Sequence, residues 1–366
     1  MNRRWICNDV WMDILPCFDR PQLGLKLALL SPRFNALVDK HFDGKSELTI
    51  WREIAIHMDK GPESKLSVQK DDNFVPFPLP NRSLPSKIRF HFLRIEYIDH
   101  SVIAFLRANH QIFDKRGTNL HLLIPSSHDM DVQPIWDIFV REIWPIFSTN
   151  IRHLRFNNGA DLDNLRRLIS PTILTDLNQL NSIKSYDLSP DGISDGFDEQ
   201  NGTNGQLLSK WLHIPRKDGQ PKRLRCADYN KEADFNWINN FKEHFLRANA
   251  ISSVSYQIHF FVRVQSVQMV PFELVNEWTK EKLTLAKENA NDWIDCWIMK
   301  RCKIIGETAV VQQQKKDENW INNCNNVFIW LDSDTNCIGP LSPPPAEEVE
   351  AEAGQSSEKG ASSAGN

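Results

Sequence analysis

The chain has 366 residues, 41% of them hydrophobic and 25% charged, which is typical of a folded globular protein long enough for two folding units. Its formal net charge of −4 excludes the general excess of positive charge that many nucleic-acid-binding proteins carry. No stretch approaches the run of about 18 apolar residues that a membrane helix needs, so we expect no membrane partner.

The first 42 residues predict three short amphipathic helices. Val10, Trp11, Ile14, Leu15 and Phe18 have helical spacing, which predicts a helix over 9–18 with one apolar stripe. A third helix is expected to begin at Ser31 and Pro32, because serine is a good N-cap and proline fits the first helical position. Its residues Phe34, Leu37 and Val38 should point inward.

The second predicted helix, over 21–30, has more apolar surface than three short helices can bury. Pro21 fits its first turn, and its leucines form two faces, one with Leu23, Leu27 and Leu30 and the other with Leu25 and Leu29. Fewer than about 40 residues rarely sustain a core alone. We therefore expect a partner or the rest of the chain to cover the second face.

The order of these residues resembles the F-box, the motif by which substrate receptors dock on the Skp-family adaptor of cullin ubiquitin ligases. The opening of that motif is matched by Ile6-Cys7, Asp9, Val10-Trp11, Asp13 and Ile14-Leu15, with Cys7 where the family usually carries proline. Its leucine-rich helix, closed by Ser-x-Arg-Phe, is matched by residues 27–34. By position, the resemblance implies adaptor contacts at Ile6, Cys7, Val10, Trp11, Leu15, Pro16, Leu25, Leu29, Ser31 and Pro32.

A connecting segment follows. Residues 48–51 and 65–68 read as short strands around a Gly61-Pro62 turn, and the proline-rich stretch from Pro76 to Pro85 reads as a surface crossing.

Strand and helix patterns then alternate with a near-constant period. Strands are predicted near Ile88, Leu120, Ile151, Ile183, Leu224 and Val254, which are 32, 31, 32, 41 and 30 residues apart. Helices are predicted between them over 100–113, 132–147, 161–178, 205–212 and 235–248. Units of fixed length favour an α/β fold in which an irregular, leucine-rich-repeat-like half-solenoid forms a parallel sheet backed by helices. A doubly wound sheet is the rival, but no strand is followed by a glycine-rich phosphate loop.

Strand alternation places basic residues and histidines on the face of this sheet that the helices leave open. One interpretation is a concave surface that binds an acidic or phosphorylated segment of a protein substrate; the other is an ordinary solvated strand face. A third interpretation of the same surface is single-stranded nucleic-acid binding. The candidate substrate-binding residues are Arg89, His91, His121, Arg152, Lys184, Arg223, Arg225 and His259.

Beyond residue 264 the sequence predicts a hairpin and a helix that cap the open end of the solenoid. The hairpin strands are residues 271–275 and 281–285, and the helix covers about 292–301. The last residues, rich in Pro, Glu, Ala, Ser and Gly, cannot bury enough apolar surface to fold.

The seven cysteines are scattered and form no Cys-x-x-Cys pair. A metal site or a disulfide framework is not expected in such a chain, so we expect reduced thiols, no metal and no cofactor, and a location in the cytoplasm, the nucleus or both. Sequence motifs of hydrolases, phosphate loops and metalloproteases are absent, so we expect no catalytic activity.

The whole chain resembles the large F-box families of nematodes, on residues 212–219, 237–241 and 271–276. That resemblance implies a non-enzymatic substrate receptor, joined through the adaptor to a cullin. The alternative is a stand-alone interaction scaffold whose F-box is weak. The predicted division is 1–45 (F-box), 46–87 (connecting strands), 88–264 (substrate-binding body), 265–340 (hairpin and helix cap) and 341–366 (acidic tail).

Overall fold

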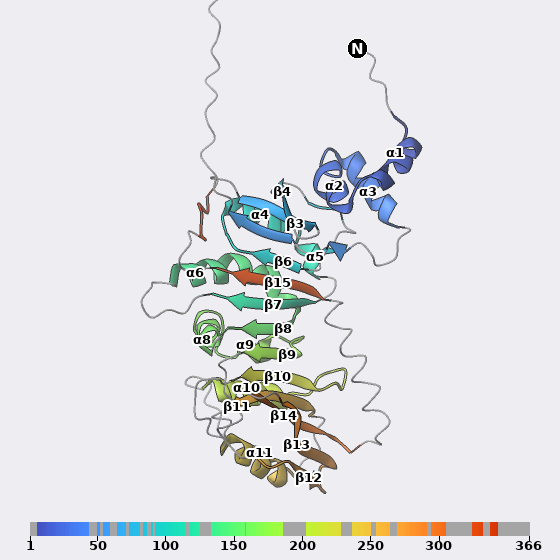
Figure 1. Ribbon diagram of the computed structural model, residues 1–366. Coiled ribbons are helices and arrows are strands. Elements are labelled where there is room, and N and C mark those ends of the chain that lie inside the picture. The colour runs from blue at the N-terminus through green and yellow to red at the C-terminus, as the bar shows by residue number, and fades with distance from the viewer. Residues whose placement is uncertain are drawn as a thin grey trace, which may run out of the picture.

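The computed structural model of the chain combines helices and strands in a mixed α/β fold (Figure 1). It describes residues 6–43, 50–51, 54–58, 64–70, 73–80, 83–85, 89–90, 92–114, 117–124, 133–157, 159–185, 203–227, 236–249, 254–263, 269–290, 294–304, 324–331 and 337–342. Among these residues, no helix has the length and apolar character needed to cross a membrane.

The N-terminal residues 6–43 form a compact helical unit, which we call the hook. The third helix begins at the expected residue, because the Ser31 hydroxyl accepts a hydrogen bond from the Phe34 amide at 3.3 Å. The second begins one residue earlier than predicted, at Arg20, and is capped by Asp19, which accepts a hydrogen bond from the Gln22 amide at 2.9 Å. The elements of the hook are α1 (Asn8–Ile14), the 3-10 turn η1 (Leu15–Cys17), α2 (Arg20–Gln22), the π-turn η2 (Leu23–Leu27) and α3 (Pro32–Asp43).

The hook has its own small core, and its second apolar face packs on the rest of the chain. Leu15, Leu23 and Val38 are buried in the hook's cluster, whereas Leu25, 2% exposed, belongs to the main core. The Lys26 ammonium also lies 5.2 Å from the ring centroid of Phe77, outside the hook. The surplus face of the second helix is therefore covered by the body, not left for a partner.

The body is built on a 13-stranded mixed sheet whose strand order is β12-β13-β14-β11-β10-β9-β8-β7-β15-β6-β2-β3-β4 (Figure 1). A separate parallel pair joins β1 (Ile50–Trp51) to β5 (Arg89–Phe90). The strands of the large sheet are β2 (Ile54–Met58), β3 (Ser64–Lys70), β4 (Asn73–Pro78), β6 (Phe92–Ile95), β7 (Thr118–Leu123), β8 (Ile151–Phe156), β9 (Ser182–Ser185), β10 (Lys222–Ala227), β11 (Tyr256–Arg263), β12 (Phe272–Asn276), β13 (Glu281–Ala290), β14 (Ile294–Lys303) and β15 (Asn325–Trp330).

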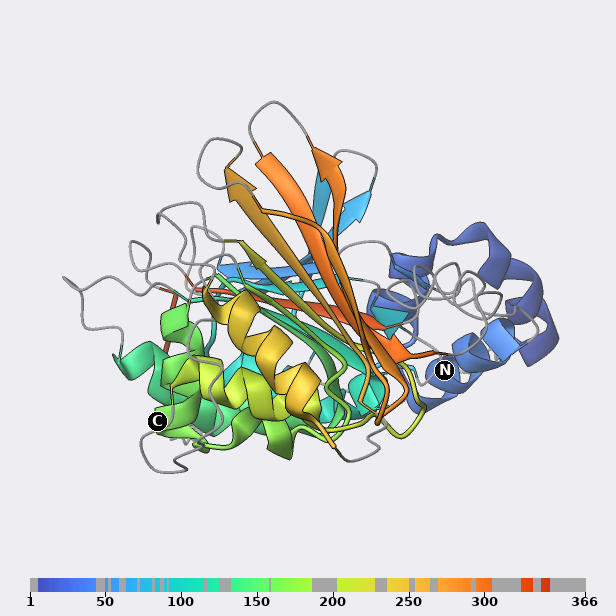
Figure 2. The ribbon, with the colours of Figure 1, turned by 90° about the horizontal axis from the view of Figure 1, so that it is seen from below.

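The middle of the sheet is parallel, and helices cover one of its faces (Figure 2). The strands from β7 to β11 lie side by side in chain order, as the near-constant period predicted. The helices that lie between β6 and β11 in the chain also match the predicted ranges. They are α4 (His100–Ala108), α5 (His110–Asp114), α6 (Gln133–Ile138) with η3 (Phe139–Ile143), α7 (Trp144–Phe147) and η4 (Ser148–Asn150), α8 (Gly159–Leu168), α9 (Ile173–Asp176), α10 (Asn204–His213) and α11 (Asn236–Arg247).

One row of apolar residues crosses the sheet in register and faces the helices. Its members are paired from strand to strand, and all are between 0 and 3% exposed. They are Leu93, Val327, Leu120, Leu154, Ile183, Leu224, Ile258, Met299 and Leu285. Because side chains alternate along a strand, the next residue of each strand lies on the open face.

Three sequence predictions are corrected by the sheet. The predicted helix over 292–301 is strand β14, which pairs antiparallel with β11 and β13 and so extends the sheet. The predicted surface crossing begins as strand β4, which accommodates Pro76 and Pro78 because it is the last strand of the sheet. Strand β15 inserts between β6 and β7, two strands expected to be neighbours.

A buried ion pair fixes the antiparallel end of the sheet. The Arg301 side chain on β14 is 3% exposed and that of Glu281 on β13 is fully buried, and the Arg301 Nη2 donates to a Glu281 carboxylate oxygen at 2.6 Å. The guanidinium also lies 5.4 Å from the ring centroid of Phe245 on α11. The pair therefore ties two strands to the helix that covers them.

We expect Glu281→Gln to lower the free energy of unfolding by about 3–5 kcal/mol, because it leaves the buried Arg301 charge without its anion. The double replacement Glu281→Leu with Arg301→Met should recover most of this loss, since it removes both charges. Urea unfolding followed by circular dichroism measures all three chains, and a Glu281→Gln chain within about 1 kcal/mol of the parent would contradict the expectation.

Candidate functional site

The hook presents apolar side chains on its outer surface. Ile6, just before α1, and Val10, within it, are 46% and 45% exposed, and Phe18 and Leu30 are 37% and 65% exposed. Cys7, Pro16 and Pro32 are exposed as well. Several exposed large apolar side chains on one small helical unit are typical of a protein-binding surface.

The Arg-Phe pair that closes the hook motif attaches the first helix to the third. Arg33 on α3 donates to the Asn8 side chain at 2.8 and 3.0 Å and to the Ile6 carbonyl at 2.6 Å. The Phe34 ring meets Trp11 edge-on, with centroids 4.8 Å apart. The two residues thereby set the position of Ile6 and Val10 on the outer surface.

Not all of the predicted adaptor contacts lie on that surface. Ile6, Cys7, Val10, Pro16 and Pro32 are exposed, and Trp11, Leu29 and Ser31 are partly exposed. Leu15 is fully buried in the hook, and Leu25 is buried against the body. In this conformation Leu15 stabilises the hook, Leu25 and Leu29 pack against the body, and the contacts available to a partner are the other seven.

On the open face of the sheet, basic residues and histidines form a row in register across five strands. Neighbouring members are direct partners in the strand pairing. The row consists of His121 (β7), Arg155 (β8), Lys184 (β9), Arg225 (β10) and His259 (β11). The arrangement brings together four residues expected from the sequence and adds Arg155, which the sequence prediction omitted.

The sequence prediction omitted Arg155 because strand β8 contains a bulge. Strand β8 pairs with β7 through Ile151 and then through His153, so Arg152 is the extra residue. The sequence alternation predicted that Arg152 would be the first residue of β8 on the open face. Because of the bulge, His153 and Arg155 lie on that face instead. Gly117 lies beside it at φ +80°, and a Cβ there would be 2.4 Å from the Arg152 side chain.

Two further candidates are not brought to this row. Arg89 lies in β5, a strand of the small two-stranded sheet, and His91 lies outside the described residues. The position next to His121 in this register is Phe328 on β15, and the one beyond it is Arg94 on β6, which forms an ion pair with Glu96 at 3.0 Å.

Burial and the nearby cations keep the histidines of the open face neutral. Burial and the neighbouring Arg155 and Lys184 lower the pKa of His121 to about 3. Burial and three cations, Arg225 foremost, lower the pKa of His259 to about 4. The pKa of His153 is lowered well below its ordinary value by burial and by nearby arginines. The charge of this face therefore comes from Arg and Lys.

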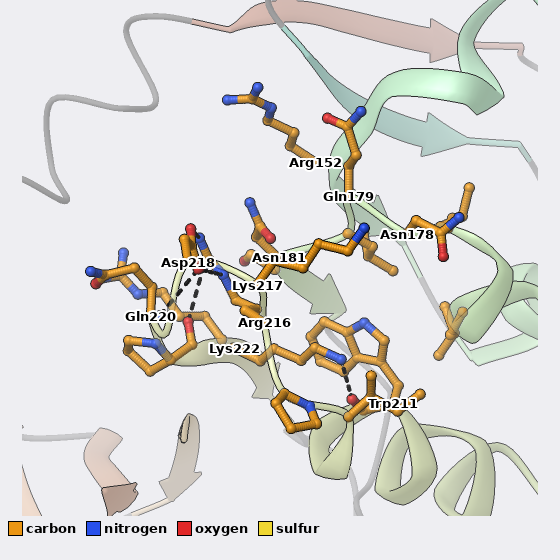
Figure 3. Close-up of a pocket in the computed structure, with 18 of the residues that line it drawn as sticks. Arg152, Asn178, Gln179, Asn181, Trp211, Arg216, Lys217, Asp218, Gln220 and Lys222 are labelled. Atoms are coloured by element: carbon orange, nitrogen blue, oxygen red, sulfur yellow. Dashed lines mark hydrogen bonds and ion pairs between the residues drawn. The ribbon is translucent and has the colours of Figure 1, made fainter. Parts of the chain in front are cut away.

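A pocket of about 620 Å³ opens at the amino ends of β8, β9 and β10 (Figure 3). Its walls are the loop that follows α9, residues 177–181, and the loop that follows α10, residues 214–221. Arg152 and Arg223, both expected from the sequence to bind a partner, line it, together with Trp211, Arg216, Lys217 and Lys222. The pocket thus gathers cationic side chains from two strands and a loop.

The loop of residues 214–221 is stabilised by an ion pair inside a turn. The Arg216 side chain donates two hydrogen bonds to the Asp218 carboxylate and one to the Pro221 carbonyl. Although burial raises the pKa of Asp218, the hydrogen bonds from Arg216 and from the Gln220 amide bring it below its ordinary value. The turn closes at Gly219, whose φ of +69° suits glycine.

Lys222 crosses the floor of the pocket. It is 5% exposed, its ammonium donates to the Trp211 carbonyl at the end of α10, and it lies 4.9 Å from the Trp211 ring centroid. Burial and the Arg216 charge lower its pKa from 10.5 to about 8. The Trp211 indole nitrogen is buried without a hydrogen-bond partner in the described part of the chain.

Within the described residues, His259, Glu288 and Cys296 form a group that could hold a metal ion, with ligand atoms within 4.8 Å of one another. The cations Arg225, Lys300 and Arg223, which lower the pKa of His259, also repel a divalent ion. The electrostatic environment therefore disfavours a metal at this point.

Comparisons with known proteins found no matching family model, no similar curated protein and no similar solved structure.

We expect stability to fall as pH drops below about 6.5, because the unfolded chain binds protons on histidines that stay neutral in the fold. Each lowered pKa means fewer protons bound in the folded state, so stability is lost as pH decreases, by at most about 1.4 kcal/mol per pH unit for each histidine. Urea unfolding at about pH 7 and about pH 5 should show a smaller pH dependence for His121→Gln than for the parent. The exposed His110→Gln is the control, and equal pH dependence in the two variants would refute the assignment.

Proposed function

We propose that this chain is a non-enzymatic substrate receptor of a cullin ubiquitin ligase, in which the hook acts as an F-box. Residues 6–43 bind a Skp-family adaptor, the sheet-based body binds a target protein, and the ligase brings ubiquitin to that target. The receptor contributes proximity, not chemistry. On this proposal the protein works inside the cell, in the cytoplasm, the nucleus or both.

The observation that carries the proposal is the hook's outer surface. Its apolar residues Ile6, Val10 and Phe18 remain exposed although the hook has a core of its own and packs on the body through Leu25. Arg33 and Phe34, which match the family's closing pattern, hold the first helix where these residues face outward. These contacts and exposures support the interpretation of the hook as a docking surface. They fit less well with the alternative, in which the three helices only cap the body.

The body supports the second half of the proposal. We interpret its parallel strand–helix units as a leucine-rich-repeat-like scaffold whose open face and pocket receive the target. The row from His121 to His259 carries positive charge and reaches solvent at Arg225, which is exposed. An acidic or phosphorylated segment is the complementary partner.

The alternative is a stand-alone scaffold with a weak F-box, and adaptor binding separates the two. The same positive row would also attract single-stranded nucleic acid, with an affinity that falls steeply as salt increases. If the chain does not bind random oligonucleotides, or binds them with an affinity that does not depend on salt, single-stranded nucleic-acid binding is excluded.

We expect Val10→Asp to weaken binding of a purified Skp-family adaptor by about tenfold or more, since it places a charge in an apolar interface. Val275→Asp on β12 is the matched control, because Val275 is 40% exposed, like Val10, but lies at the far end of the sheet. Calorimetric titration gives the affinities. If the parent chain does not bind the adaptor, the receptor proposal is wrong.

We expect Cys7→Pro to strengthen adaptor binding about two- to fivefold, by stiffening the entry to α1. The site suits proline, because Cys7 has φ −67°, precedes the first helical residue, and its amide donates no hydrogen bond within the described residues. Cys7→Ala controls for loss of the thiol. A measured loss of affinity in Cys7→Pro would show that Cys7 is misaligned with the family's proline.

A further inference from the structure

The pocket at the amino ends of β8, β9 and β10 carries more positive charge than its own residues neutralise. Five cationic side chains and one carboxylate line it, and that carboxylate, Asp218, pairs with Arg216. Neither Arg152 nor Lys217 forms an ion pair or side-chain hydrogen bond within the described part of the chain. Such a concentration of charge attracts an anion that carries more than one negative charge.

A buried donor in the same pocket also points to a ligand. Trp211 is 1% exposed, and its indole nitrogen, a donor only, has no acceptor in the described residues. Leaving such a group unsatisfied costs about 1–3 kcal/mol. Figure 3 shows the indole between Lys222 and the pocket side chains of the loop after α9. A ligand oxygen would complete its hydrogen bonding.

The pocket has room for more than an inorganic ion. Its volume of about 620 Å³ is within the range of small-molecule sites, about 300–1,000 Å³. Apolar residues form part of the wall and would contact the carbon skeleton attached to the anionic group. They are Leu174, Leu177, Leu180, Ile214, Pro215 and Pro221.

We propose that this pocket binds a phosphate monoester, with Arg152, Lys217 and Arg223 neutralising the phosphate and the Trp211 indole donating to one of its oxygens. A phosphate monoester carries about −1.5 to −2 charge near pH 7 and three strong acceptor oxygens, whereas a carboxylate carries a single charge. Arg152 on β8 and Arg223 on β10 both line the pocket, and guanidinium forks match the oxygens of such a group. The group belongs either to a phosphorylated side chain of a protein or to a free organic phosphate.

The phosphate site does not depend on adaptor binding. Only its use in choosing phosphorylated targets rests on the proposed function, so binding is measured on the purified full chain without adaptor. Failure of the phosphate site and failure of adaptor docking are then separate results.

The test is calorimetric titration with phenyl phosphate and with phenyl sulfate, which has nearly the same shape but one negative charge. A second arm uses pooled peptides of random sequence around a fixed phosphoserine, beside the same pool with serine. We expect phenyl phosphate to bind about tenfold or more tightly than phenyl sulfate. Tighter binding of the phosphoserine pool identifies a protein side chain as the source, and binding of phenyl phosphate alone identifies a free organic phosphate.

Arg152→Gln and Lys217→Gln should each weaken phenyl phosphate binding by about tenfold, because each removes one charge-assisted contact. Both residues are exposed, so these variants should fold; Trp211→Phe tests the indole donor separately. Arg247→Gln is the control, since Arg247 is exposed on α11 and pairs with Glu243 outside the pocket. Equal affinity for phosphate and sulfate, or unchanged affinity in both Arg152→Gln and Lys217→Gln, overturns the proposal.

Discussion

Strand β15 is the constraint on which the rest of the sheet depends. It lies between β6 and β7 and pairs with both in parallel, so the strands that contact the hook and the strands that carry the pocket are one sheet only through it. Side chains reinforce the ladder: Asn119 donates to Asn326 at 2.8 Å, and Phe328 stacks on Phe92 with centroids 4.0 Å apart. The hook and the basic face are therefore held in a fixed relation by a segment remote from both in sequence.

The strand alternation gives this sheet two faces of opposite character. The row that includes Leu120, Leu154 and Leu224 anchors the helices, and the next residue of each strand carries charge on the open face. The sequence was sufficient to predict this much, because strand and helix patterns alternate with a near-constant period and the strand residues are strongly apolar every second position. The hook was predictable for a similar reason, since its caps and prolines lie at the helix starts.

What could not be predicted depends on contacts between distant segments. The residues of β14 include Trp297 and several apolar neighbours, a pattern that fits a helix as well as a strand buried between β11 and β13. The insertion of β15 has no local signature at all. The bulge at Arg152 follows from pairing with β7, so no pattern within β8 alone could place His153 and Arg155 on the open face. Arg152 itself lines a pocket whose other wall, residues 214–221, is remote in sequence.

The position of β15 also bears on how the protein is made. A ribosome completes β6 and β7 long before it reaches Asn325, and until then these two strands lack the partner that separates them in the finished sheet. Each leaves a row of backbone amides and carbonyls open on one edge, a form that pairs readily with other extended chains. During synthesis the edges of β6 and β7 that face each other therefore stay without β15, and closing the sheet is one of the last steps of folding.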